Sequence, residues 1–314
     1  MGYKSIIGHE EIIKTFDITI NNNRFSHAHI FLGEDGIGKS VIAKNIAIKL
    51  IGENEYKDYV DIVHFRLEKN KASIGVNAVR GLIEEINKKP YQSEKKVVII
   101  HEGHKMTIQA QNALLKTIEE PPKNVFVFIL CENIENILDT IKSRCQIHKF
   151  NTLSEDEMRT YLQVHYPELN EDNIALLLSF SNGVPGKAEF LMNNEDFREL
   201  RDKAINMILL LNNMKELDIF KEEEFFTKNS NMWVDIMEVF ISFIRDTIIY
   251  KEIGCEELLI NKDKLEEIKQ CANMFSFTKL NDIINIINET RENIDRNVNN
   301  LLAFDVMLLK MQEV

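Results

Sequence analysis

The stretch that decides the fold is HIFL-GEDGIGKS-VIAKNIAIKL, residues 29–50. Its centre, residues 33–40, matches the P-loop pattern G-x-x-x-x-G-K-[ST] at every required position. A short apolar run comes before the match, and apolar residues at helical spacing come after it. The stretch therefore predicts a strand, a phosphate-binding loop and a helix in succession, unless the match is a glycine turn that arose by chance.

The loop contains the residue types that bind nucleotide phosphates. Gly33, Gly36 and Gly38 let backbone N–H groups turn toward a phosphate, and the next helix presents its positive N-terminal end. We expect Lys39 to reach the β- and γ-phosphates and the Ser40 hydroxyl to join the Mg²⁺ shell. The sequence thus predicts an ATP site formed by these five residues.

Strand-like and helix-like segments alternate through the rest of the first half. Apolar runs at residues 60–65, 97–100 and 125–130 are typical of strands, and the last two are typical of strands buried on both faces. Apolar residues at helical spacing mark residues 76–86 and 107–120, and prolines follow both segments. This alternation predicts an α/β domain, a parallel sheet with helices on both faces.

The second half is predicted to be helical. All five prolines and eleven of the twelve glycines lie at or before Gly186, and only Gly254 interrupts the remainder. A capping-box pattern opens a helix at residues 154–157, and residues 183–186 read as a turn before another helix. We therefore predict three domains: a P-loop domain at 1–150, a small helical domain at 151–195 and an all-helical domain at 196–314.

Two apolar stripes support the last of these domains. One runs from residue 233 to residue 244, and it is more typical of a helix core than of an interface. Another, near the end of the chain, contains Leu301, Leu302, Val306 and Leu309. Both stripes are typical of amphipathic helices, and in an oligomerising domain such a stripe can be core and interface together.

Charge limits the partners that the chain can bind alone. The 314 residues contain 38 basic and 50 acidic side chains, a net charge of −12. Residues 1–150 hold 21 basic and 19 acidic side chains, so the acidity belongs to the helical half. Neither half has the basic footprint of an independent DNA-binding protein.

The composition also points to a cellular compartment. No apolar run approaches the roughly 18 residues of a membrane span, and the N-terminus lacks a signal-peptide core. The four cysteines have no close spacing, which is typical of a reduced protein without a disulfide framework. We therefore expect a cytoplasmic protein with no membrane partner.

The segment after residues 97–100 weakens the case for hydrolysis. A P-loop ATPase needs an acidic residue here to hold Mg²⁺, but the first position is His101, and imidazole is a poor ligand for that ion. Glu102 follows, and it is either a water-orienting base or a surface carboxylate. His101 and His104 do not form the H-E-x-x-H zinc pattern, so no metal site is expected.

Several further motifs together resemble one family. Residues 112–122 read NALLKTIEEPP and residues 143–146 read SRCQ; shorter matches lie at 7–10, 26–29 and 296–301. In this order they resemble the subunits of the bacterial DNA polymerase III clamp loader, which belong to the AAA+ class. The resemblance implies that residues 151–195 are a lid and residues 196–314 a collar that mediates oligomerisation.

Departures from the family pattern indicate the type of subunit. The motor subunits, gamma and tau, have an acidic pair where this chain has His101-Glu102. They also have a four-cysteine zinc module, but the corresponding residues 52–64 of this chain contain no cysteine. A motor would also place a sensor arginine near Gly186. The chain therefore looks most similar to the family's non-motor stator, the delta-prime type.

The resemblance also implies a mechanism. In this family five AAA+ subunits form an open ring with ATP between neighbours, and an arginine from one subunit completes the next subunit's site. Arg144 is the implied trans-acting finger. The implied first sensor in the nucleotide site is one of Cys131, Glu132 and Asn133, with Asn133 favoured. The other interpretation of Arg144 is a surface arginine paired with a local carboxylate.

The implied partners are gamma/tau and delta subunits, with the beta sliding clamp and primed DNA reached through the complex. Gln109, Asn112 and Lys116 lie on a polar helix face whose family counterpart is near DNA, and here only weak contact is expected. The implied cofactor is ATP without zinc, in a component of the polymerase holoenzyme with weak or absent ATPase activity. The alternatives are a gamma/tau-type motor that uses Lys39 and Glu102, and a stand-alone P-loop kinase.

Overall fold

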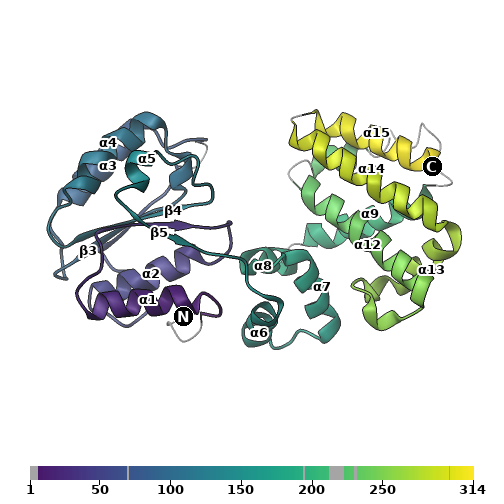
Figure 1. Ribbon diagram of the computed structural model, residues 1–314, viewed down its shortest axis with the longest axis horizontal. Helices are drawn as coiled ribbons and strands as arrows, with labels where there is room; N and C mark the ends of the chain where they lie inside the picture. The colour runs from purple at the N-terminus through teal and green to yellow at the C-terminus, as the bar shows by residue number, and fades with distance from the viewer. Residues whose placement is uncertain (1–5, 69–70, 194, 212–222, 230–231, 297) are drawn as a thin grey trace. The chain divides into compact units, whose positions relative to one another are not determined.

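The computed structural model describes residues 6–68, 71–193, 195–211, 223–229, 232–296 and 298–314. The chain forms two compact units (Figure 1). The first comprises Met1–Pro167 and Asn182–Lys187, and the second comprises Glu168–Ser181 and Ala188–Val314. The three-domain division stays a prediction. Asn297, in the resemblance motif at 296–301, lies outside the described residues.

The first unit is built on a five-stranded parallel sheet in the order β2-β3-β4-β1-β5. This confirms the predicted α/β class. The strands are β1 Ala28–Leu32, β2 Ile62–Phe65, β3 Lys96–Ile100, β4 Val125–Cys131 and β5 Gln146–Lys149. The sequence pattern missed β5, because this edge strand is mostly exposed and has no apolar run. Its register on β1, with Gln146 opposite His29, supplies the pairing that the pattern does not show.

Helices cover both faces of this sheet. In Figure 1, α1 and α2 lie on one face, and α3, α4 and α5 lie on the other. Alternate strand residues such as Ile30 and Val98 pack with Leu82 of α3 and Leu114 of α4, as a period of two requires. The helices are α1 Glu10–Asn21, α2 Lys39–Leu50, α3 Val76–Asn87, α4 Ile108–Glu119, α5 Asp139–Lys142 and α6 Glu155–His165, with the short 3₁₀ turn η2 at Gly103–Lys105.

The start of α6 confirms the predicted capping box. The Ser154 hydroxyl accepts the Glu157 N–H at 3.3 Å, and the Glu157 carboxylate accepts the Ser154 N–H at 2.8 Å. Two donors at the helix start are thereby satisfied, and the helix begins where the sequence predicts it.

A pair of histidines, His29 buried and His148 half-buried, lies on the α1 side of the sheet. His29 Nδ1 and His148 Nε2 are 2.9 Å apart, and the two rings pack beside Phe16 and Phe31. Burial, assisted by His148, lowers the pKa of His29 to about 3. Burial likewise lowers the pKa of His148 to about 4, so both rings are neutral at ordinary pH.

The described part of the second unit is all helical, as predicted. Its elements are α7 Glu171–Ser181, α8 Pro185–Asn193, α9 Glu195–Leu210, α11 Glu223–Lys228, α12 Trp233–Ile253, η4 Glu256–Leu258, η5 Lys262–Lys264, α13 Leu265–Met274, α14 Phe277–Asp295 and α15 Asn300–Glu313. The first turn of α8 belongs to the first unit. The expected turn at 183–186 is shorter than predicted, because Pro185 already begins α8. Proline suits a first helical position, where its missing N–H costs nothing.

The apolar stripe near the end of the chain lies on α15 and is only partly buried, since Leu301 and Leu309 are half-buried. Leu302 is 57 % exposed and Val306 is 43 % exposed. The buried face is the one that carries Phe304 and Met307, and the Phe304 ring stacks on Phe226 of α11 at 4.2 Å between centroids. Both faces of α15 are apolar, so the position of the packing partner, not the pattern, decides which one is covered.

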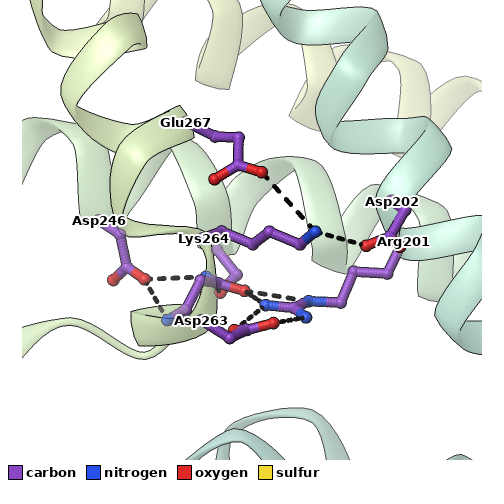
Figure 2. Close-up of polar contacts among 8 residues, drawn as sticks. Arg201, Asp202, Asp246, Asp263, Lys264 and Glu267 are labelled. Carbon is purple, nitrogen blue, oxygen red and sulfur yellow. Dashed lines mark hydrogen bonds and ion pairs between the residues drawn. The ribbon is translucent and has the colours of Figure 1, made fainter.

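A buried polar network joins α9, α12 and the turn before α13 (Figure 2). The Asp246 carboxylate is fully buried and accepts the N–H groups of Ile260 and Asn261 at 2.9 and 2.7 Å, and the Asn261 amide at 2.8 Å. Asn261 in turn accepts from Arg201, which forms a two-pronged ion pair with Asp263 at 2.6 and 2.7 Å. Each buried polar group thus has a partner from another element, as burial of charge requires.

We expect Asp246→Ala to lower the free energy of unfolding by about 3 kcal/mol or more, because two backbone N–H groups would remain buried without an acceptor. Urea unfolding of the full chain measures this. Glu252→Ala, an exposed carboxylate on the same helix, is the control and should change stability by less than about 0.5 kcal/mol. Equal stability of the two variants would contradict a supporting role for the network.

Because the pKa values of His29 and His148 are lowered, we predict that the free energy of unfolding falls in mild acid. Folding favours the neutral ring, so its contribution is complete above the unfolded pKa of about 6.5 and is lost as pH falls toward 3 to 4. At pH 5 the loss for His29 alone is about 2 kcal/mol relative to pH 7. Urea unfolding at both pH values measures it. If the free energy of unfolding falls between pH 7 and pH 5 by as much in His29→Gln as in the unchanged chain, other groups cause the effect.

Candidate nucleotide site and arginine turn

The P-loop connects β1 to α2, as the sequence predicts. Gly36 and Gly38 have φ angles of 78° and 101°, in the left-handed region that favours glycine, and Gly38 is the N-cap of α2. The loop therefore ends at a helix N-terminus, where free N–H groups and the helix dipole attract an anion. Its backbone has the form that a bound phosphate needs.

Lys39 is folded back onto its own loop. The side chain is nearly buried, and its Nζ donates to the carbonyl oxygens of Gly33 and Glu34 at 2.7 and 2.6 Å. Burial lowers the pKa of Lys39, against the raising effect of nearby carboxylates led by Asp35. Ser40 is exposed beside it. A phosphate would compete with two carbonyl groups for the Lys39 ammonium.

The first turn of α8 lies directly on the P-loop. The Gly186 N–H donates to the Gly36 carbonyl at 2.9 Å, and a Cβ on Gly186 would lie 2.6 Å from the Gly36 Cα. No side chain fits at 186 without moving the loop. A sensor arginine in this position is therefore incompatible with the backbone contact that the chain makes here.

The end of β3 has no carboxylate in the position expected for Mg²⁺. His101 is buried, and its Nε2 lies 3.0 Å from Nδ1 of His64 on β2. Burial lowers the pKa of His101 to about 4, and the charge of Arg66 adds to this effect. The ring is thus a neutral imidazole paired within the sheet. The P-loop fits a nucleotide phosphate, but this position does not supply an oxygen ligand for Mg²⁺.

Glu102 is half-exposed and paired with a lysine. Its Oε1 lies 2.5 Å from the Lys105 Nζ, and its φ of 52° places it in a left-handed turn. Contact with Glu102 raises the pKa of Lys105. A carboxylate held by an ammonium group is less available to take a proton from water.

Asn133 lies at the same edge of the sheet, in the loop after β4. Its Oδ1 accepts the Glu135 N–H at 2.8 Å, so this oxygen is engaged in a local turn. The loop borders a pocket of about 400 Å³ at the carboxyl ends of β1, β4 and β5. The lining residues are Leu32, Gly33, Glu34, Ile37, Glu132, Asn133, Ile134, Glu135, Lys149, Phe150, Asn151 and Thr152.

Arg144 lies at the opposite edge of the sheet, just before the amino end of β5. Its Nη2 is 2.7 Å from Oε1 of Glu119, the last residue of α4. Its Nη1 donates to the Thr140 carbonyl at 2.8 Å and to the Ser143 hydroxyl at 3.2 Å. The Arg144 side chain is 40 % exposed, and its guanidinium pairs with a local carboxylate in this structure.

Cys145 and Gln111 hold the turn that carries Arg144 against the rest of the first unit. Cys145 packs against the core between the sheet and α4, and burial raises the pKa of its thiol to about 12. Gln111 of α4 is buried and makes three hydrogen bonds: it donates to the carbonyls of Met106 and Asn136 and accepts the Leu138 N–H. The sequence patterns missed the roles of Gln111 and Glu119, although both lie in or beside the stretch at 112–122.

The predicted site residues thus fall into two groups. The P-loop, Glu102 and Asn133 gather at the carboxyl edge of the sheet, and Arg144 lies at the amino edge. Among the described residues no three His, Cys, Asp or Glu side chains gather to hold a metal ion. None of the helices described combines the length and apolar character that a bilayer crossing requires.

Comparison with known families identifies this arrangement. Residues 8–154 match the family model of the DNA polymerase III delta subunit, and residues 195–313 match the model of its C-terminal region. The chain belongs to the DNA polymerase III delta-subunit family. The resemblance stated from the motifs is thereby confirmed.

Two sequence relatives agree with this assignment. The chain is 27 % identical to the delta-prime subunit of Bacillus subtilis DNA polymerase III, over 96 % of this chain and 95 % of that subunit. It is 24 % identical to the tau subunit of the same organism, over 98 % of this chain and 61 % of tau. Among solved structures, a gamma-subunit-related protein of Thermotoga maritima aligns over 95 % of this chain and 98 % of its own, at 16 % identity and a TM-score of 0.43. The expected delta-prime-type clamp-loader role is confirmed, and the roles of single site residues stay predictions.

Proposed function

We propose that this chain donates Arg144 to the nucleotide site of a neighbouring clamp-loader subunit. The observation that supports this is the separation of Arg144 from the chain's own P-loop. β1 begins beside β5 at the amino edge of the sheet and ends at the P-loop, and its five residues span about 16 Å. Arg144 therefore acts on a phosphate held by another chain. A guanidinium at the γ-phosphate stabilises the charge of the transition state and is worth roughly 10³ to 10⁵ in rate.

The chain's own nucleotide site is proposed to bind ATP and to hydrolyse it weakly or not at all. The loop backbone, Lys39 and the start of α2 fit the phosphates. His101 offers no oxygen to Mg²⁺, and Glu102 is paired with Lys105. These two contacts favour a stator over the motor alternative, which needs Glu102 free to orient water. No contact in the described residues favours the kinase alternative.

The proposed partners are gamma/tau-type and delta-type subunits, and through them the beta clamp and primed DNA. Gln109, Asn112 and Lys116 are exposed on one face of α4, where they are available for shared contacts to phosphate. Glu119 and Glu120 at the end of this helix offset the positive charge that Lys116 gives to that face. Contact with DNA is therefore expected to depend on the assembled complex.

In a complex reconstituted with motor and delta subunits, Arg144→Ala should reduce single-turnover hydrolysis at the neighbouring motor site by about 10³-fold or more, with little change in nucleotide affinity there. Rapid-quench measurement with primed DNA tests this. Lys142→Ala removes a cation two residues away and is the control. Unchanged hydrolysis and clamp loading with Arg144→Ala would refute the donated arginine.

The isolated chain should bind a fluorescent ATP analogue with similar affinity in Mg²⁺ and in EDTA. The reason is that His101, directly after β3, offers no oxygen ligand to Mg²⁺. Lys39→Ala should weaken this binding by about tenfold or more, the value of a charged hydrogen bond to phosphate. Lys44→Ala, five residues further along α2, should leave it unchanged. Steady ATP turnover that Lys39→Ala abolishes would favour the motor alternative instead.

A further inference from the structure

Glu119 occupies a position that a carboxylate normally avoids. It is the last residue of α4, with Glu120 as the C-cap and Pro121-Pro122 directly after it. The C-terminal end of a helix carries a partial negative charge, so an acidic side chain there is repelled by the helix dipole and by its neighbour Glu120. A nearby cation offsets this repulsion, and in this structure the cation is Arg144.

The three acceptors around the Arg144 guanidinium are not equivalent. The Thr140 carbonyl and the Ser143 hydroxyl belong to the same turn and are neutral. Glu119 comes from another element and supplies the negative charge, at 2.7 Å from Nη2. The two neutral contacts hold the side chain on its turn, and the carboxylate occupies one prong of the guanidinium.

A carboxylate and a phosphate compete for the same face of a guanidinium, because both accept its parallel N–H donors. The Arg144–Glu119 pair is about two-fifths exposed on each side, and such pairs are weak in water. The pair can therefore be exchanged for a more highly charged triphosphate when one is presented.

We propose that Glu119 is the resting counter-ion of Arg144, a positioning residue that holds the guanidinium until the triphosphate of a neighbouring subunit displaces it. This rests on the proposed function of Arg144. The backbone of the turn stays in place during the exchange, because Cys145 packs in the core and Gln111 binds the preceding loop. The exchange is a rotation of the Arg144 side chain.

Glu119→Gln tests the proposal in the reconstituted complex, because glutamine keeps the size of the side chain and removes its charge. We expect a non-hydrolysable ATP analogue to bind about two- to fivefold tighter at the neighbouring motor site, the range for a partly exposed ion pair. The KM for ATP should fall by the same factor, and kcat should change by less than about twofold.

Two controls separate this role from a general change in charge. Glu120→Gln removes the adjacent exposed carboxylate and should change neither quantity. In an Arg144→Ala background, Glu119→Gln should be silent, because its effect passes through Arg144. The same tightening in the Arg144→Ala background would overturn the proposal.

The remaining outcomes are also decisive. An unchanged KM and analogue affinity in Glu119→Gln, with the expected loss in Arg144→Ala, would overturn the counter-ion role and leave the donated arginine intact. A loss of kcat in Glu119→Gln comparable to that of Arg144→Ala would make Glu119 an aiming group rather than a competitor. Full activity of Arg144→Ala would overturn both proposals together.

Discussion

The parallel pairing of β1 with β4 and β5 is the constraint on which the rest of the first unit depends. β1 is almost fully buried, and its backbone is shared between the two neighbouring strands. Parallel strands send their carboxyl ends to one edge of a sheet and their amino ends to the other. The P-loop must therefore follow β1 at one edge, and Arg144 must precede β5 at the opposite edge. The P-loop and Arg144 of one chain therefore lie at opposite edges of the sheet and do not contact each other.

The nucleotide edge is shaped by groups that are neutral or already paired. Lys39 is bound to loop carbonyls, Glu102 to Lys105, and His101 to another histidine. The close approach of Gly186 to Gly36 brings backbone against backbone where a motor subunit would need an arginine. The named side chains of this edge are therefore engaged by groups of the same chain. The amino edge, in contrast, presents a cation that is paired with a partly exposed carboxylate.

Features with a short-range physical cause could be predicted from the sequence. The P-loop, the buried runs of β3 and β4 and the capping box of Ser154 each depend on residues within a few positions of one another, and the structure confirms them. β5 was missed because an exposed edge strand has no apolar pattern. The buried face of α15 could not be predicted because both of its faces are apolar, and Phe226, distant in sequence, decides between them.

The sequence by itself determined that this chain has the P-loop pattern between a strand and a helix, a histidine directly after β3 and the Ser-Arg-Cys motif of its family. The tertiary structure decided what those groups face. Arg144 and Glu119 are 25 positions apart, and only the return of α4 to the amino edge of the sheet brings them to 2.7 Å. Gly36 and Gly186 are 150 positions apart and touch through their backbones. Such contacts depend on how distant segments pack, and local periodicity carries no information about that packing.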